Sequence, residues 1–223
     1  LWFIRAIQKF AHKYSLREAA DLYGQLCADI ITYYRKQNHP RALLHRNGLI
    51  WVDGIKRPAT WMNATENGWP ITPRTGYVVE INALWYNAML FTAEMLREMG
   101  KETSADLMEY QANIAKDAFV KTFWNGVYLY DFVVNDYADK EVRPNMIWAV
   151  GLPFSPLDKR QQKAVVDICT KELLTPRGLR SLSPKSGNYR PMYYGNQLER
   201  DRSLHNGVVW PSTITAYSRA YMN

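Results

Sequence analysis

The stretch from Tyr77 to Met99 constrains the fold of this chain more than any other part of the sequence. Written as a helix, it is hydrophobic on nearly every side, and Gly100 is a signal for its end. Such a helix is stable only when other elements enclose it, so the rest of the chain must supply neighbours on all sides. We therefore expect one domain over residues 1–223, a length that can bury a sizeable core.

The flanking segments have the periodicity of helices that expose one face to water. Apolar residues recur every three or four positions in 16–36 and in 104–123. Two long loops rich in polar and aromatic residues, 38–76 and 176–206, precede the most hydrophobic helices. The helices that the pattern predicts are 1–13, 16–36, 77–99, 104–123, 145–150, 157–174 and 208–222.

This alternation of enclosed and one-faced helices favours an all-α fold, an α/α barrel whose long loops build a site at one end. A solenoid of helical repeats is the alternative, but the sequence has no fixed period. A strand-like run at 127–132 lies in a third loop, 124–142. We expect all three loops to project to one end of the barrel, with 38–76 and 176–206 lining a common pocket.

Charge and composition exclude several classes of protein. The net charge of +7 is spread along the chain and interleaved with acidic residues, which argues against a nucleic-acid partner. No apolar run approaches the roughly 18 residues of a membrane span. Cys27 and Cys169 lie far apart, as reduced thiols of a cytoplasmic protein would. Aromatic residues make up 13% of the chain, and their faces suit stacking on sugar rings.

Polar residues that could form a site fall into three clusters. Glu80 begins the apolar helix, where an unpaired carboxylate is costly, so it needs a partner. That partner is the N-terminal helix dipole or Arg74, or else a sugar hydroxyl. His205 is either a capping or core histidine or a ligand-binding one. The candidates are Trp61, Asn63 and Arg74 in the first cluster, Glu80, Asn82, Trp85 and Tyr86 in the second, and Arg200, Asp201, His205 and Trp210 in the third.

Neither a metal nor a cofactor is expected. The four histidines have no spacing typical of metal ligands relative to one another or to carboxylates, and no glycine-rich phosphate loop is present.

Four separated blocks carry a family resemblance. The run TWMNATENGWPITPRTGYVVEINALWYNAM at 60–89 resembles the glucosidase domain of glycogen debranching enzymes, the amylo-α-1,6-glucosidase part. The resemblance continues in order through RPNMIWAVGLPFSPLD at 143–158, LLTPRGLRSLSP at 173–184 and RDRSLHNGVVWPS at 200–212. It implies an (α/α)6 toroid, of which this chain would supply about seven helices. It also implies hydrolysis, with inversion, of α-1,6 branch linkages in glycogen or a related α-glucan.

The resemblance assigns roles residue by residue. Inverting hydrolysis needs a proton donor and a carboxylate base. The family's donor is an Asp in its TWMDA block, where this sequence has Asn63, and its base is a Glu that we expect beyond residue 223. If activity persists with Asn63, the remaining donors are Glu80 and Asp201. The implied sugar contacts are stacking by Trp61, Trp85, Tyr86 and Trp210, and hydroxyl binding by Arg74, Glu80, Asn82, Arg200, Asp201 and His205.

Two alternatives to an active glucosidase stay open. A carboxamide cannot deliver a proton, so Asn63 is compatible with a glucan-binding relative that does not catalyse. A structural helical scaffold would not explain why polar residues gather in the long loops. The chain starts at Leu1 without an initiator Met and stops in a helical run, so we expect a fragment, inactive alone, with a possible upstream domain.

Overall fold

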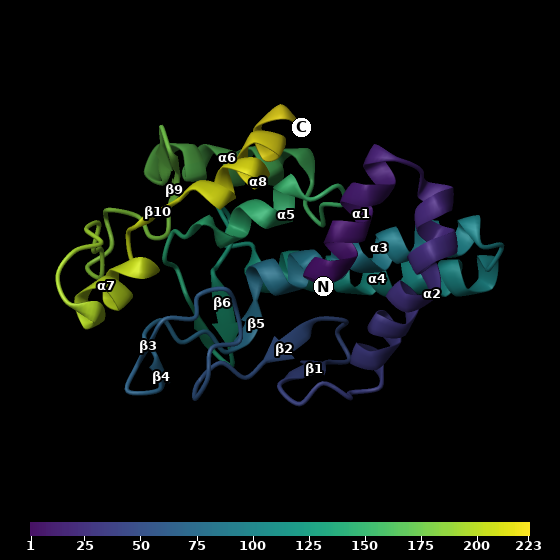
Figure 1. Ribbon diagram of the computed structural model, residues 1–223, viewed down its shortest axis with the longest axis horizontal. Coiled ribbons are helices and arrows are strands. Elements are labelled where there is room, and N and C mark those ends of the chain that lie inside the picture. Colours follow the sequence, from purple (N-terminus) through teal and green to yellow (C-terminus); the bar gives the residue numbers. More distant parts are fainter.

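Helix α3 (Val79–Glu98) runs through the middle of the molecule, with the other long helices packed around it (Figure 1). In the computed structural model, which describes residues 1–223, fifteen of its 20 residues are buried. Helices α1 (Trp2–Lys13), α2 (Leu16–Arg35), α4 (Glu102–Phe123) and α5 (Trp148–Gly151) all contact it. The expectation of an enclosed helix is therefore confirmed.

The chain forms eight α-helices and two short 3-10 helices, and side chains cap several of them. Ser15 caps α2, and reciprocal capping boxes formed by Asp158 with Gln161 and by Asn196 with Glu199 begin α6 and α7. The bounds are α1 (Trp2–Lys13), α2 (Leu16–Arg35), α3 (Val79–Glu98), α4 (Glu102–Phe123), η1 (Pro144–Ile147), α5 (Trp148–Gly151), α6 (Lys159–Glu172), α7 (Gln197–Leu204), η2 (Pro211–Thr213) and α8 (Ile214–Met222).

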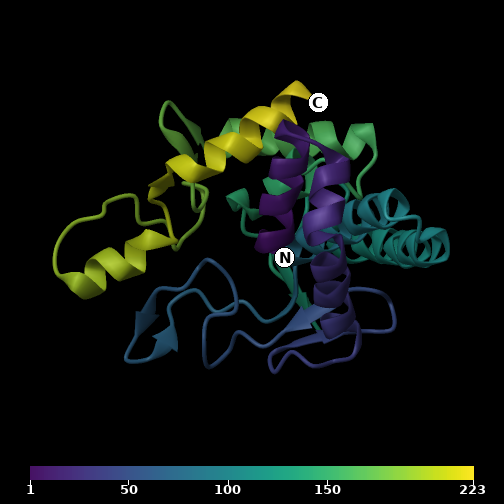
Figure 2. The same ribbon diagram turned by 45° about the vertical axis from the view of Figure 1, so that its right-hand side comes forward.

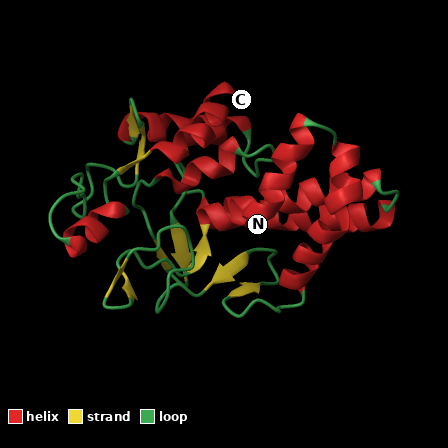
Figure 3. Ribbon diagram, in the orientation of Figure 1, coloured by secondary structure: helices red, strands yellow, loops and turns green.

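Short antiparallel strands correct the expectation of an all-α fold (Figure 3). They form a five-stranded sheet in the order β1-β2-β5-β6-β7, a three-stranded sheet β10-β9-β8 and a β3-β4 pair. The bounds are β1 (Ala42–Leu44), β2 (Ile50–Val52), β3 (Thr65–Glu66), β4 (Trp69–Pro70), β5 (Gly76–Val78), β6 (Phe132–Val134), β7 (Tyr137–Ala138), β8 (Leu174–Thr175), β9 (Gly178–Arg180) and β10 (Val209–Trp210).

The largest sheet joins segments that lie far apart in the sequence. Trp51 pairs with Tyr77, and Tyr77 pairs with Val133. Periodicity within one segment cannot show such pairing, because each strand has only two or three residues. The sheet places β5 between the hairpin β1–β2 and the strand β6, and β5 leads directly into α3.

Two helix predictions and one loop prediction also need correction. The helix expected at 208–222 begins at Ile214, because Val209 and Trp210 pair with β9 and Pro211 starts a 3-10 turn. The segment 145–150 is a 3-10 turn followed by one α-helical turn. Helix α7 forms inside the expected loop 176–206. The (α/α)6 toroid is not confirmed and stays a prediction.

The hydrophobic core has two parts that both include residues of α3. One is built mainly from α1, α2, α3 and α4, and the other from α3, α5, α6 and α8. No helix is both long and apolar enough to span a bilayer.

Helix α7 and the β3–β4 hairpin lie on the same side of the molecule, away from the first four helices (Figure 2). An ion pair of 2.6 Å joins Arg202 of α7 to Glu66 of β3. The expected meeting of the loops 38–76 and 176–206 is thus confirmed.

Candidate functional site

A buried cluster of charged side chains lies at the N-terminal end of α3. Arg74, just before β5, donates from Nε to Asp131 Oδ2 at 2.7 Å and from Nη2 to Asp131 Oδ1 at 3.0 Å. It also donates to both oxygens of Glu80 in the first turn of α3, with 2.7 Å between Nη2 and Oε2. The three side chains are only 1–2% exposed.

Local structure explains why these three residues meet. The pairing of β5 with β6 brings Asp131 beside the start of α3, where the Val79 amide donates to the Asp131 carbonyl at 3.1 Å. Burial lowers the pKa of Arg74, but the charges of Asp131 and Glu80 outweigh it and raise the pKa, so Arg74 stays charged. Burial raises the pKa of Glu80, and Arg74 opposes that rise. Arg74 is therefore the partner that Glu80 requires.

Asn145 connects this cluster to the aromatic residues of the first loop. Its amide Nδ2 donates to Asp131 Oδ1 at 2.7 Å, and its Oδ1 accepts from the indole Nε1 of Trp61 at 2.7 Å. Trp61 meets His205 and Trp210 edge to face, with ring centroids 5.1 and 5.0 Å away. His205 stacks on Trp210 with an interplanar angle of 11°. The chain thus brings together residues from three of the blocks that carry the resemblance.

Asn63 lies at the exposed edge of this arrangement. Its side chain is exposed, while its backbone N–H donates to His205 Nε2 at 3.1 Å. Because Nε2 accepts, the proton of the neutral ring is on Nδ1, which is buried without a partner. Burial, together with the charges of Arg143 and Arg74, lowers the pKa of His205 to about 4. A neutral His205 therefore fixes the loop that carries Asn63.

Three residues of the second predicted cluster lie elsewhere. Trp85 is 1% exposed, packs against Tyr34 and donates from Nε1 to the Gly48 carbonyl at 3.0 Å. Tyr86 is buried in the same core. Asn82 exchanges hydrogen bonds with the backbone of Ile50, which ties α3 to β2. The structure does not bring these three residues to Trp61 and Asn63.

Arg200 and Asp201 lie on α7, beside the site but outside the cluster. Arg200 donates to the Gly195 carbonyl, and Asp201 accepts from Gln197 Nε2 at 2.8 Å. Both are half-buried. They stabilise α7 and its preceding turn, while Arg202 makes the contact with the first loop.

A cavity of about 770 Å³ lies where the three predicted loops meet. Residues 66–73 supply the first loop's part of the lining, residues between Phe132 and Glu141 the second's, and Asn188, Arg190, Arg202 and Asn206 the part around the third. The volume is in the usual range of small-molecule sites, about 300–1,000 Å³. The lining is mostly polar, as a ligand rich in hydroxyl groups requires.

Three residues of the buried network were missed by the sequence interpretation. Asp131 is a single acid between apolar residues in the run Tyr128–Val134, a signal for a paired buried carboxylate. Asn145 and Arg143 stand in the second block of the resemblance. Arg143 donates to the carbonyls of Ser181 and His205 and, at 3.1 Å, to Asn206 Oδ1.

Comparison with known proteins gives the family. A family model described as amylo-alpha-1,6-glucosidase matches residues 1–223. The chain belongs to this family. A glycogen debranching enzyme of Saccharomyces cerevisiae is 27% identical over 223 residues, covering 78% of this chain and 14% of the yeast protein. The chain thus spans a small part of that relative's length. Membership of the amylo-α-1,6-glucosidase family supports a function of the glycoside hydrolase type.

Proposed function

We propose that the full-length protein hydrolyses α-1,6-glucosidic branch linkages of glycogen or a limit dextrin, with inversion. The observation that carries the proposal is the convergence of three loops on one polar cavity in a chain that matches the glucosidase family throughout. Trp61 and Trp210 are half-buried and offer ring surface for a sugar, whereas Trp85 does not.

Asn63 holds the position from which the leaving oxygen would be protonated. Its exposed amide can bind a glycosidic oxygen but cannot deliver a proton. Acid catalysis contributes about 10²- to 10⁴-fold to such reactions. We therefore propose that the natural activity is low at this step.

The decisive experiment restores a carboxyl group. Asn63→Asp in the full-length protein should increase release of free glucose from a glycogen limit dextrin by about 100-fold or more. Asn188→Asp is the matched control, because it adds the same charge to an exposed residue of the cavity lining, whereas Asn63 lies outside that lining. Equal and high rates in the wild type and the Asn63→Asp variant would refute the assignment of Asn63.

In that case the proton donor must be another carboxyl group. Glu80 is 1% exposed with both oxygens bound by Arg74, so it does not face the cavity. Asp201 does not line the cavity either, but it is half-buried on α7 with no cation bound to its carboxyl group, so it is the better alternative. Asp201→Asn would then abolish glucose release.

The second candidate function is glucan binding without hydrolysis, and the carboxamide of Asn63 favours it. Both the wild type and the Asn63→Asp variant would then bind maltoheptaose and release no glucose. Calorimetry together with the glucose assay separates the two functions.

A further inference from the structure

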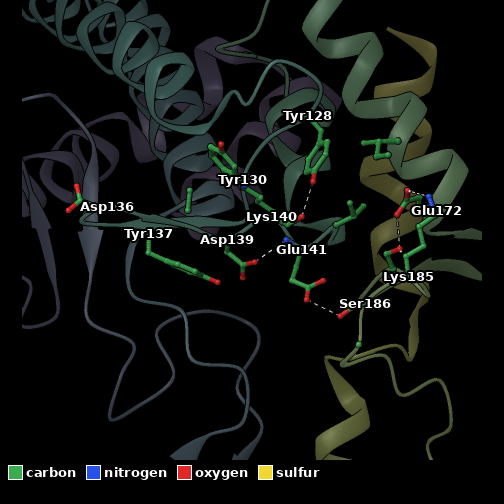
Figure 4. Close-up of a pocket in the computed structure, with 15 residues that line it drawn as sticks. Tyr128, Tyr130, Asp136, Tyr137, Asp139, Lys140, Glu141, Glu172, Lys185 and Ser186 are labelled. Atoms are coloured by element: carbon green, nitrogen blue, oxygen red, sulfur yellow. Dashed lines mark hydrogen bonds and ion pairs between the residues drawn. The ribbon is translucent and has the colours of Figure 1, made fainter.

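A second cavity, of about 940 Å³, lies between the β6–β7 hairpin and helix α6. It is bounded by residues 128–142, by Ile168 and Glu172 of α6, and by the loop 183–187 (Figure 4). None of the site residues predicted from the sequence lines it. Its size is again that of a small-molecule site.

We propose that this second cavity is an additional binding site for an α-glucan chain. The proposal rests on the proposed function for the class of its ligand, and it assigns that ligand to residues outside the site described above.

Aromatic rings supply the first argument. Tyr128, Tyr130 and Tyr137 all line the cavity, and Tyr137 is 57% exposed. The hydroxyl of Tyr128 donates to the Lys140 carbonyl at 2.9 Å, which fixes the orientation of its ring. Tyrosine combines a flat apolar face with a polar tip, so it can pack on the C–H face of a sugar and bind a hydroxyl group.

Asp139 supplies the second argument. It is only 8% exposed, yet it lines the cavity. Its Oδ1 accepts from the Glu141 N–H at 2.9 Å, whereas its Oδ2 has no partner in the protein. Figure 4 shows this carboxyl group between Tyr137 and Glu141. Solvent reaches the free oxygen of this carboxyl group, and a sugar hydroxyl can replace that water as its hydrogen-bond donor.

The charge of the lining narrows the class of ligand. Lys185 is paired with Glu172 at 2.6 Å, and Glu141 accepts from the hydroxyl of Ser186 at 2.9 Å. The acids Asp136, Asp139, Glu141 and Glu172 outnumber Lys140 and Lys185. This is a locally negative surface on a chain of net charge +7. It disfavours phosphorylated and other anionic ligands and suits a neutral polyhydroxyl chain.

The two cavities share part of their walls. Tyr137, Asp139 and Glu141 line both of them. A branched glucan could therefore place one chain in each cavity and cross the segment 137–141. Binding in the second cavity would then position the branch for the first.

The test measures maltoheptaose binding by calorimetry. Tyr130→Ala removes a ring that lines only the second cavity, and Gly187→Trp fills that cavity. A Cβ added at Gly187 meets no atom within 4 Å, so a side chain can be introduced there without a clash at its base. Both variants should weaken binding at one site by about tenfold or more. The matched controls are Gly187→Ser, and Tyr110→Ala on the exposed surface of α4.

Trp69→Ala separates this proposal from the proposed function, because Trp69 is 56% exposed and lines only the first cavity. The proposal is supported if one maltoheptaose-binding site is lost in both Tyr130→Ala and Gly187→Trp. The same site must be kept in Trp69→Ala. Unchanged binding in those two variants together with weaker binding in Trp69→Ala overturns the second site and leaves the proposed function standing. A wild type that binds no maltoheptaose contradicts both.

Discussion

Two arginine–glutamate pairs in this molecule have the same chemistry and opposite surroundings. Arg74 and Glu80 are 1–2% exposed and share their network with Asp131, whereas the side chains of Arg202 and Glu66 are 40% and 33% exposed. Each pair has one residue in the loop 38–76, but Arg74 and Glu80 are close in the sequence, whereas Arg202 and Glu66 are far apart. The buried pair must satisfy each of its charges within the protein, while water can replace either partner of the exposed pair.

The comparison shows which part of the loop 38–76 is held firmly and which part can move. Arg74 anchors the loop to the first turn of α3 through charges that cannot be left unpaired. Arg202 holds the β3–β4 hairpin against α7 by a contact that solvent competes with. We therefore expect the hairpin to adapt to a ligand while the base of the loop stays in place.

The largest expected effect is that of Arg74→Met. It leaves Glu80 buried without a cation and Asp131 with only Arg143, whose Nε lies 4.0 Å from Oδ2, and should lower the free energy of unfolding by about 3–5 kcal/mol. Urea denaturation followed by circular dichroism measures the change. A loss below about 1 kcal/mol would mean that water reaches the two carboxylates, and the contrast between the two pairs would fail.

A pH titration of stability should show the next largest effect, through His205. Its pKa is about 4 in the folded protein and about 6.5 when unfolded, so the unfolded state binds its proton first as the pH falls. The stability that neutral His205 provides is complete above about pH 6.5 and is lost toward pH 4, by roughly 3 kcal/mol. Because other groups titrate in this range, the difference between the wild type and His205→Gln is the quantity to measure. An identical pH dependence in both proteins would contradict the prediction.

The neutral side chain of Asn82, at the same end of α3, separates the effect of burial from the effect of charge. Asn82→Ala leaves the buried N–H and carbonyl of Ile50 without their side-chain partner and should cost about 2 kcal/mol. Thermal unfolding checks this value. A cost equal to that of Arg74→Met would show that burial, not charge, determines how firmly the loop is held.

The smallest expected effect is that of Arg202→Met. Since the side chain is well exposed, the urea midpoint should be unchanged within error. The result expected instead is faster proteolysis of the β3–β4 hairpin, because its contact with α7 is gone. Glu66→Gln should behave in the same way, and a clear fall in the urea midpoint of either variant would contradict the comparison.

The sequence predicted the enclosed helix because its pattern is local. Sixteen of the 23 residues at 77–99 are apolar, which leaves few choices, and the structure has a helix at 79–98. Trp61 and Trp85, two of the three tryptophans in the block 60–89, show the limit. Both were predicted to contact a sugar, but Trp61 reaches the candidate site, whereas Trp85 lies in the enclosed helix and is buried in the core.

The features that could not be predicted from the sequence are those that depend on contacts between residues far apart in the chain. The strands β5 and β6 are three residues each and meet across more than 50 residues of chain, so no periodicity marks them. Asp131 lies next to β6, and its pairing with Arg74 could not be predicted until that strand was placed. The same reason explains why Asn145, which joins Asp131 to Trp61, was not recognised.

The backbone amide of Val79 stands at the junction of β5 and α3 and donates to the carbonyl of Asp131. That carbonyl also accepts from Nη2 of Arg74 at 3.2 Å. Exchange of this single amide hydrogen with deuterium requires its hydrogen bond to Asp131 to open, and with it the contact between the start of α3 and the residue that precedes β6. Val79 is a natural reporter within the chain, since its exchange rate follows the opening of the base of the loop independently of any glucan or enzymatic assay.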